Sequence, residues 1–373
     1  MRDGWEIMKL GEVCVIERGG SPRPIQSYLT DDPNGLNWIK IGDAVEGSKY
    51  IVSTKERIIP EGLKKTRFVH KGDFLLSNSM SFGRPYILAI DGCIHDGWLV
   101  IHDADNRFDK SFLYYYLSSK NIYAEFKRLA VGGVVNNLNS ELVRNVNVSI
   151  PPLSEQERIV EELDLLSGII EKKRQQLKEL DNLAQSIFYD MFGDPITNEK
   201  GWEVLPLKKA ALLKAGKAIK ANELSENCDV GLYPCYGGNG IRGYISKKSH
   251  KGQFPIIGRQ GALCGNVVFA KGEFYATEHA VVCNNIIDSF KPLWLYYALK
   301  YNNLNRYAQG VAQPGISVNI INEMPLIYPP LPLQQEFAEK IEAIEKQKEL
   351  VKQSLAETET LFNSRMDYYF SEE

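Results

Sequence analysis

The chain has 373 residues and a net charge of −3, with 44% hydrophobic and 24% charged residues. This composition is typical of a globular protein with two domains and argues against intrinsic disorder. Because the sequence lacks a run of about 18 apolar residues and an apolar N-terminal stretch, we expect neither a membrane span nor a signal peptide. Six scattered cysteines without a C-x-x-C pair disfavour a zinc site and predict reduced thiols in a cytoplasmic protein.

The charge is distributed unevenly along the chain. Residues 1–150 (module one) carry a net charge of +1, and residues 201–328 (module two) carry +6. Residues 151–200 and residues 329–373 each carry −5. The small total therefore conceals a basic block between two acidic segments, and such a block favours a polyanionic partner such as DNA.

Module one contains a polar stretch between two strand-like runs, "LLSNSMSFGRPY", which begins at Leu75. Serine, asparagine and arginine side chains can hydrogen-bond to phosphates or to base edges. A solvated hairpin loop is the alternative interpretation of the same pattern. The candidate DNA contacts of module one are Ser77, Asn78, Ser79 and Arg84, together with Lys40 in the upstream sequence "WIKIGD".

The segment that opens with "PPLSEQERIVEEL" predicts a long helix. From Ile159 to Met191, apolar residues recur at steps that alternate between four and three, which is the spacing of a coiled coil. Ser154 and Glu157 fit an S-x-x-E capping box at the start of this helix. The sequence "FGDP", from Phe192, supplies the glycine and proline that commonly end a helix. We therefore expect a helix of roughly 38 residues.

Module two contains two glycine-rich stretches, "YGGNGIRGY" and "IIGRQGALCGN". The letters "GNGIRG" match the dinucleotide fingerprint G-x-G-x-x-G, but a polar loop follows them instead of a helix, so we predict a turn. Glycine lets the backbone approach a ligand, and Asn, Gln and Arg can bind base edges. The candidate base contacts are Asn239, Arg242, Arg259 and Gln260, and the candidate phosphate contacts are Lys217, Lys220, Lys247 and Lys251. Solvated hairpin loops are again the alternative.

A second helix entrance, "PPLPLQQEFAEKI", repeats the first one 178 residues later. Two other pairs of segments keep the same order: "FLYYYL" and "WLYYAL" are 182 residues apart, and "WEIMKLGEVCVIERG" and "WEVLPLKKAALLKAG" are 197 apart. Matching order with drifting offsets indicates a duplicated module. The apolar seam of the second helix runs from Phe337 to Phe362, and Pro332 falls in its first turn, where proline is tolerated.

The two long helices should pair with each other, because each would otherwise expose an apolar seam. Connectivity predicts an antiparallel pair with one module at each end and a pseudo-two-fold axis between them. Lys173 and Lys348 interrupt the seams, either by extending their amines to solvent or by fixing the register of the pair. The acidic outer faces, expected to bind partner proteins, comprise Glu161, Glu162, Glu171, Glu339, Glu342 and Glu349.

The ordered set of motifs resembles the DNA-specificity subunits of type I restriction-modification systems. The resemblance covers essentially the whole chain and rests on the W-E openings at Trp5 and Trp202, "WIKIGD", the glycine-rich stretches, "TEHAVV" from Thr277, the PPL-x-x-Q entrances and "FGDP". It implies an α+β fold class with two similar target-recognition domains in inverted orientation, joined by two long antiparallel coiled-coil helices. The expected domains are target-recognition domains 1–150 and 198–328 and helical spacers 151–197 and 329–373.

The resemblance also implies a non-catalytic subunit that binds double-stranded DNA at a bipartite, asymmetric target and needs no cofactor or metal of its own. Two modification subunits that use S-adenosylmethionine would be its partners, with restriction/motor subunits that use ATP and Mg. In agreement, we find no phosphate-binding loop, H-E-x-x-H or G-x-S-x-G motif.

Two alternatives remain: a modification-only or type II-like system, and a coiled-coil scaffold that binds proteins and not DNA. The two modules also differ so much internally that the sequence does not carry base contacts from one to the other.

Overall fold

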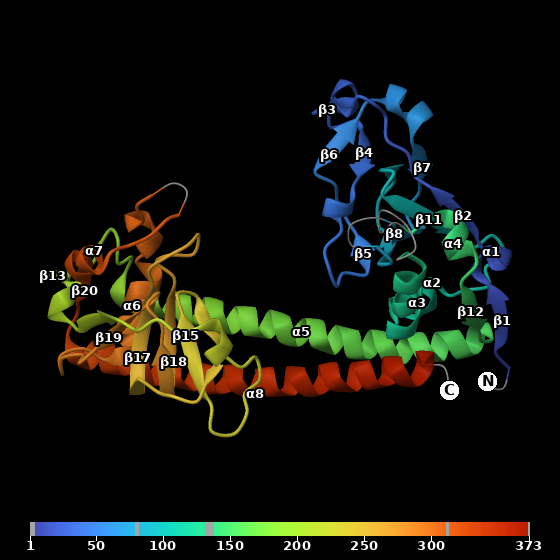
Figure 1. Cartoon of the computed structure of the whole chain (residues 1–373). Helices are drawn as coiled ribbons and strands as arrows, with labels where there is room; N and C mark the ends of the chain where they lie inside the picture. Colours follow the sequence, from blue (N-terminus) through green and yellow to red (C-terminus); the bar gives the residue numbers. More distant parts are fainter. Residues whose placement is uncertain (1–3, 79–81, 131–137, 311–312, 372–373) are drawn as a thin grey trace. The chain divides into compact units, whose positions relative to one another are not determined.

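The computed structural model describes residues 4–78, 82–130, 138–310 and 313–371, which divide into two compact units (Figure 1). Unit one combines Met1–Lys173 with Ser354–Glu373, and unit two is Arg174–Gln353. The division falls inside the two longest helices, α5 (Leu153–Phe192) and α8 (Leu331–Phe370). Each unit therefore contains one module and part of each long helix.

The described part of module one is built around two sheets. The main sheet has the order β2-β11-β8-β9-β5, formed by Val15–Arg18, Trp98–His102, Phe74–Ser77, Pro85–Leu88 and Tyr50–Ile51. The second has the order β3-β6-β4-β10-β7, formed by Leu29–Thr30, Glu56–Ile58, Leu36–Ile39, Gly92–Ile94 and Arg67–Val69. A separate antiparallel pair is formed by β1 (Glu6–Lys9) and β12 (Asn147–Ile150). The helices are α1 (Leu10–Val13), α2 (Lys110–Ser118), α3 (Lys120–Ala130), α4 (Ser140–Arg144) and the 3-10 turns Ile25–Ser27, Ile41–Asp43 and Pro60–Lys65.

Helix α2 attaches module one to the long helices of unit one (Figure 1). It begins at Asp109, whose carboxylate accepts hydrogen bonds from two backbone N–H groups of the first turn, as an N-cap does. On its buried face the ring of Phe112 lies 5.7 Å from that of Phe370 in α8. The Tyr115 hydroxyl donates a hydrogen bond to Asp164 of α5 at 2.5 Å. Aromatic burial and a polar contact thus both fix this attachment.

Module two has one main sheet in the described residues, with the order β14-β19-β17-β18-β15-β16. Its strands are Leu212–Ala215, Ala280–Asn284, His250–Gly258, Val267–Ala276, Tyr233–Gly237 and Gly240–Ile245. A separate antiparallel pair is formed by β13 (Glu203–Pro206) and β20 (Pro325–Tyr328). The helices are α6 (Pro292–Tyr301), α7 (Val318–Glu323) and the 3-10 turns Leu207–Lys209, Ala221–Glu223 and Leu304–Tyr307. Helix α6 packs on β17 and β18, and its buried Trp294 lies 5.8 Å from the ring of Phe192 in α5.

The two modules share one backbone frame. The strand order β2-β11-β8-β9 of module one corresponds to β14-β19-β17-β18 of module two. Gly83 N donates to Ser77 O, and Gly265 N donates to Gly258 O, both at 2.7 Å. Three further bonds of module one have counterparts in module two. The bond from Asn78 N to Gly97 O corresponds to that from Arg259 N to His279 O, and the bond from His95 N to Ile39 O corresponds to that from Thr277 N to Tyr236 O. The bond from Leu138 N to Asn78 O corresponds to that from Ile316 N to Arg259 O. The predicted repeat is therefore confirmed, and backbone hydrogen bonds align the interiors that the sequence alone does not.

The predicted capping box at the start of the first long helix is wrong. Helix α5 begins at Leu153, one residue before Ser154, so the serine lies within the first turn and cannot cap it. The Pro152 carbonyl instead accepts hydrogen bonds from the backbone N of Glu155 and Gln156 at 2.9 and 3.1 Å. At the other end the prediction is confirmed, because the helix stops at Phe192 and the next residue is a glycine with a φ of +74°.

A buried glutamine fastens each helix entrance. Gln156 accepts a hydrogen bond from Asp109 N at 2.8 Å and donates to the carbonyls of Arg107 and Pro151, both at 2.9 Å. The matched Gln334 accepts from Lys291 N at 3.0 Å and donates to the carbonyls of Ser289 and Pro329 at 3.2 and 2.9 Å. The repeated PPL-x-x-Q motif is thus a joint between the long helix and the start of α2 or α6.

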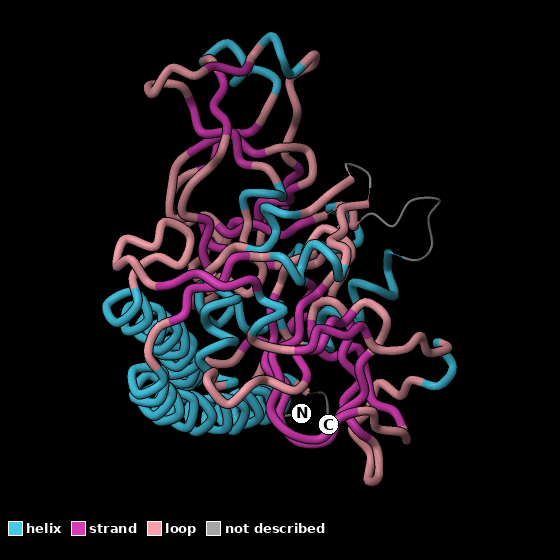
Figure 2. The backbone as a smooth tube through the Cα atoms, turned by 90° about the vertical axis from the view of Figure 1, so that its left-hand side faces the viewer, coloured by secondary structure: helices cyan, strands magenta, loops and turns pink. Residues whose placement is uncertain are grey.

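The long helices lie side by side (Figure 2), and their contacts show that they are antiparallel in each unit, as predicted. In unit one the Lys173 amine donates to the Ser354 carbonyl, the Ser354 hydroxyl and the Thr358 hydroxyl at 2.6–2.8 Å. In unit two the Lys348 amine, whose side chain is only 12% exposed, pairs with Asp181 at 2.7 Å. Both amines therefore bind the facing helix instead of extending to solvent, which favours the register-fixing interpretation.

Candidate nucleic-acid interface

Matched loops gather at the ends of matched strands in the two modules. In module one the loop after β8 contacts the turn at residues 95–97, and in module two the loop after β17 contacts the turn at residues 277–279. The contacts are Asn78 N to Gly97 O at 2.9 Å and Arg259 N to His279 O at 3.1 Å. Since loops carry recognition residues on a rigid scaffold, these two clusters are the candidate interface.

The predicted turn in "GNGIRG" is confirmed, since β15 and β16 form a hairpin around it. The hairpin packs closely on the end of β17: a side chain at Gly258 would place its Cβ 1.7 Å from the Gly238 carbonyl oxygen. Asn239, at the tip of this turn, is exposed and accepts a hydrogen bond from the Asn266 amide at 2.6 Å. Glycine at position 258 therefore lets the turn approach the loop that carries Arg259.

The four predicted base contacts of module two occupy neighbouring segments. Arg242 is exposed on β16, close after the turn that carries Asn239. Arg259 is half-buried, and its Nε is buried without a hydrogen-bond partner among the described residues. Gln260 is exposed and pairs through its backbone with Gly315. This cluster offers amide and guanidinium groups of the kind that bind base edges.

Two of the predicted phosphate contacts of module two, Lys247 and Lys251, lie apart from this cluster and form ion pairs, whereas the backbone N–H of Lys217 donates to the Ala276 carbonyl beside the cluster at 3.1 Å. Lys247 and Lys251 flank the start of β17, whereas Arg259 and Gln260 follow its end. Lys247 pairs with Glu223 at 2.5 Å, and Lys251 pairs with Glu273 at 3.3 Å. The hydrogen bond with Glu223 raises the pKa of Lys247. Lys217 and Lys220 are exposed on the segment after β14. Because such exposed ion pairs are weak, phosphates could replace the carboxylates.

The described predicted contacts of module one are either buried or engaged in ion pairs. Ser77 and Asn78 are buried, so in this conformation they support the loop and do not reach solvent. Ser79 lies outside the described residues. Asn78 donates from its amide to Asp96 O at 3.1 Å, while its Oδ1 has no partner among the described residues. Arg84 is partly exposed and pairs with Glu46 at 2.7 Å, and Lys40 pairs with Glu56 at 2.5 Å.

A cavity of about 690 Å³ beside Lys40 contains a serine, a histidine and a carboxylate. The Ser21 hydroxyl donates to Asp96 at 2.8 Å, and His95 Nε2 lies 3.0 Å from the same oxygen. His95 Nδ1 accepts a hydrogen bond from Gly97 N at 2.9 Å, so Nε2 carries the proton. Burial lowers the pKa of His95. Because both side chains bind the acid and not each other, the serine lacks the base that a nucleophile requires.

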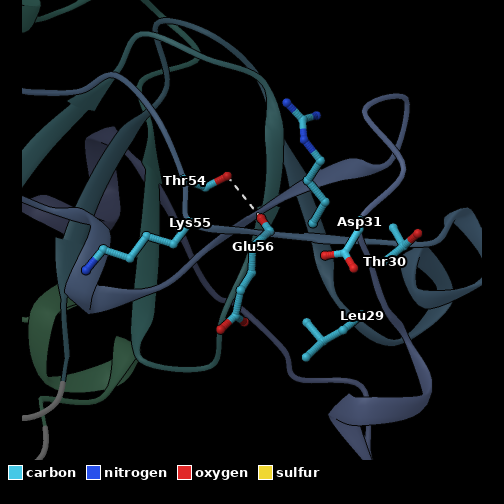
Figure 3. Close-up of a pocket in the computed structure, with 7 residues that line it drawn as sticks. Leu29, Thr30, Asp31, Thr54, Lys55 and Glu56 are labelled. Carbon is cyan, nitrogen blue, oxygen red and sulfur yellow. Dashed lines mark hydrogen bonds between the residues drawn. The ribbon is translucent and has the colours of Figure 1, made fainter.

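A smaller cavity of about 350 Å³ lies on the second sheet of module one (Figure 3). Leu29, Thr30 and Asp31 lie on one side of it, and residues 54–56 lie on the other. The Thr54 hydroxyl donates to the Glu56 carbonyl at 3.0 Å. Within the described ranges, no group of three or more His, Cys, Asp or Glu side chains could hold a metal ion.

The predicted acidic faces of the long helices are largely exposed. Glu161, Glu171, Glu339, Glu342 and Glu349 lie at the surface. Glu162 was wrongly assigned to this face, because its carboxylate forms an ion pair with Arg365 of the facing helix.

Sequence reasoning also missed four exposed leucines that lie beyond the first turn of α5 or α8 and outside the heptad seams. They are Leu165 (65% exposed), Leu183 (47%), Leu350 (60%) and Leu361 (50%). Leu183 and Leu361 are 178 residues apart, so they are matched by the repeat.

All six cysteines are free thiols. No helix in the described part of the chain is long and apolar enough to span a membrane.

Known proteins resemble the chain in sequence and in fold. A family model described as "Type I restriction modification DNA specificity domain" matches residues 2–182 and 199–360. The chain is 29% identical over 353 residues to the type I restriction enzyme EcoprrI specificity subunit of Escherichia coli, covering 90% of this chain and 86% of that protein. It is 22% identical over 370 residues to the MjaIX specificity subunit of Methanocaldococcus jannaschii, covering 89% and 85%.

Two solved structures are similar to the chain in fold. The S subunit of a type I restriction-modification system from M. genitalium has a TM-score of 0.64 at 15% identity, and the match covers 99% of this chain and 96% of that one. A structure from work on complex assembly and conformational transition of the type I R-M system has a TM-score of 0.55 at 19% identity, covering 99% and 98%. At these identities the likeness concerns the fold alone.

Proposed function

The chain belongs to the family of type I restriction-modification specificity subunits, and on that premise we propose that it recognises a bipartite, asymmetric DNA target and recruits modification and restriction subunits. The observation that carries the proposal is the duplicated loop cluster. One backbone frame presents Glu46 and Arg84 in module one and Asn239, Arg259 and Gln260 in module two. Because the side chains differ, the two modules would bind different half-sites.

Lysines around these clusters would supply the sequence-independent part of binding. Module two is the more basic module, with 14 basic and 8 acidic side chains in residues 201–328. Neutralising phosphates releases counterions, so affinity should fall steeply as the salt concentration rises. A protein-binding scaffold without DNA affinity would lack this salt dependence.

The subunit itself would have no catalytic activity and need no cofactor. Ser21, His95 and Asp96 combine the residue types of a catalytic set, but their hydrogen bonds leave the serine without a base. Methyl transfer and DNA cleavage would belong to partner subunits that use S-adenosylmethionine, ATP and Mg. A pure subunit that methylates, cleaves or hydrolyses ATP would contradict this assignment.

The outer faces of α5 and α8 would bind two modification subunits. Leu183 and Leu361 are matched by the repeat and exposed, and acidic residues flank both of them along the helices. Two like surfaces on one chain imply two like partners. Apolar side chains within a polar face would supply the buried centre of each contact.

Co-expression with the modification partners, followed by mapping of methylated bases in host DNA, tests the proposal. The expected result is one methylated motif with two different half-sites separated by a spacer of fixed length and any sequence. Deletion of the chain should abolish that methylation. A continuous palindromic motif, or methylation that persists without this subunit, would contradict the proposed function.

A further inference from the structure

The shared backbone frame also matches two side chains that bridge neighbouring loops. Arg84 and Asn266 occupy matched positions, because the carbonyl of each accepts a hydrogen bond from the last residue of β8 or β17, at 3.0 and 2.8 Å. Each side chain reaches the segment that follows β4 or β15, the strands whose carbonyls accept the matched bonds from His95 N and Thr277 N. Arg84 Nη1 lies 2.7 Å from Glu46 Oε1, and the Asn266 amide donates to Asn239 Oδ1 at 2.6 Å. We call these contacts the cross-loop pairs.

We propose that Glu46 and Asn266 are specificity-determining residues, each holding the reading side chain of its own module. Glu46 orients Arg84 toward a guanine in one half-site, and Asn266 acts together with Asn239 on an adenine in the other. The inference rests on the proposed function, since it assigns residues to the two half-sites. Neither Glu46 nor Asn266 stands out in the sequence, because each gains its role only from a partner on another loop.

The chemistry of the pair in module one fits guanine. Glu46 engages Nη1 of Arg84 and the Tyr86 hydroxyl binds the same guanidinium, which leaves the rest of its five N–H donors for a base. Arginine binds guanine through two donors directed at N7 and O6, which are both acceptors. The Glu46 side chain is 79% exposed, so the ion pair adds little to stability. Its main effect is to restrict the orientation of Arg84.

The chemistry of the pair in module two fits adenine. The bond between Asn266 and Asn239 uses one amide nitrogen and one amide oxygen. It leaves the Asn239 nitrogen as a donor and the Asn266 oxygen as an acceptor. If the oxygen and nitrogen of both amides were exchanged, one donor and one acceptor would again remain. Adenine presents an acceptor at N7 and a donor at N6, whereas guanine presents two acceptors.

The test uses the chain copurified with its modification subunits and DNA duplexes with randomised half-sites, which are sequenced after selection. Glu46→Ala should reduce the preference for guanine at one position of the first half-site about tenfold. Asn266→Ala should reduce the preference for adenine in the second half-site by about the same factor. Each variant is the control for the other, because its effect should be confined to its own half-site. Affinity for random DNA and thermal unfolding should stay at the wild-type values.

Conservative variants show whether the hydrogen-bonding groups of Glu46 and Asn266 matter or only the presence of a side chain at these positions. Glu46→Gln keeps an acceptor for Arg84 and should retain most of the guanine preference. Asn266→Asp removes the amide donor and should lose the adenine preference. If the wild-type complex is selective but both alanine variants keep every base preference, or weaken all sequences equally, the inference is overturned. A wild-type complex that selects no sequence would refute the proposed function and the inference together.

Discussion

Modules one and two differ at the matched position after β8 and β17. Asn78 is buried there in module one, whereas Arg259 is half-buried in module two, although the same two backbone hydrogen bonds hold both. The cross-loop pairs differ likewise, one being an ion pair and the other a pair of amides. Backbone bonds therefore fix where the loops lie, and side chains fix what they can contact. Substitutions at matched positions of the frame should therefore have the same effect in both modules, whereas a substitution in a loop should affect only its own module.

The largest effect is expected at the matched leucines of the long helices. Leu183→Asp and Leu361→Asp should each remove one modification subunit from the copurified complex, because a carboxylate would be buried unpaired in the contact. The double variant should bind none. Gln175→Asp, on α5 at an exposed position away from the leucines, is the control and should retain both subunits. Retention of two subunits by the double variant, measured by native mass spectrometry, would place the partner elsewhere.

Substitution of the glutamine at either helix entrance should lower the unfolding free energy by the same amount. Gln156→Ala and Gln334→Ala each remove three hydrogen bonds and leave buried backbone groups unpaired, which should cost about 2–4 kcal/mol of unfolding free energy. Urea unfolding of each variant measures the loss. Gln175→Ala should change stability by less than about 0.5 kcal/mol, because that side chain is exposed. Strongly unequal losses would show that the two joints are not equivalent.

The loops of module two should divide into two classes. Arg259→Ala or Gln260→Ala should cost about 1–3 kcal/mol on the second half-site and relax discrimination there. Lys247→Ala or Lys251→Ala should weaken binding to every sequence and flatten its salt dependence. Titration of cognate and random duplexes at several salt concentrations distinguishes the classes. Equal losses on both duplexes for all four variants would make the base-reading assignment wrong.

The smallest effect concerns an ion pair found in unit one. The hydrogen bond with Arg365 lowers the pKa of Glu162, whereas the repeat places Ile187 and Lys340 at the matched positions of unit two. A lowered pKa stabilises the fold above the unfolded value of about 4.3 and loses this contribution as pH falls through the folded value. Arg365→Met should raise the pKa of Glu162 in an NMR titration and make the unfolding free energy less sensitive to acid. An unchanged pKa would show that the pair is not formed in solution.

The sequence predicts features that depend on local period and on repetition. The seams from Ile159 and from Phe337, the helix end at Phe192 and the turn in "GNGIRG" are all confirmed, because spacing and glycine placement determine them locally. The capping box fails because the Pro152 carbonyl starts the helix one residue before Ser154. Serine and glutamate fit a cap by type, but the tertiary joint at Gln156 decides where the helix begins.

Contacts between distant segments could not be predicted from the sequence. Glu162 belongs to the helix interface because Arg365 faces it, and a helical period does not identify the facing residue. Ser77 and Asn78 are buried, Asn78 being held by its bonds to the carbonyls of Gly97 and Asp96, and an irregular loop has no period that separates inward from outward side chains. Glu46 and Asn266 become candidates only because the fold places them beside Arg84 and Asn239.

Exchange of one module shows whether each module reads its own half-site. Residues 201–328 would be replaced by the corresponding segment of a family member with a known target, and methylated host DNA would be mapped. We expect one half-site to change to that of the donor, while the other half-site and the spacer length stay the same. A change in both half-sites, or in neither, would contradict this expectation.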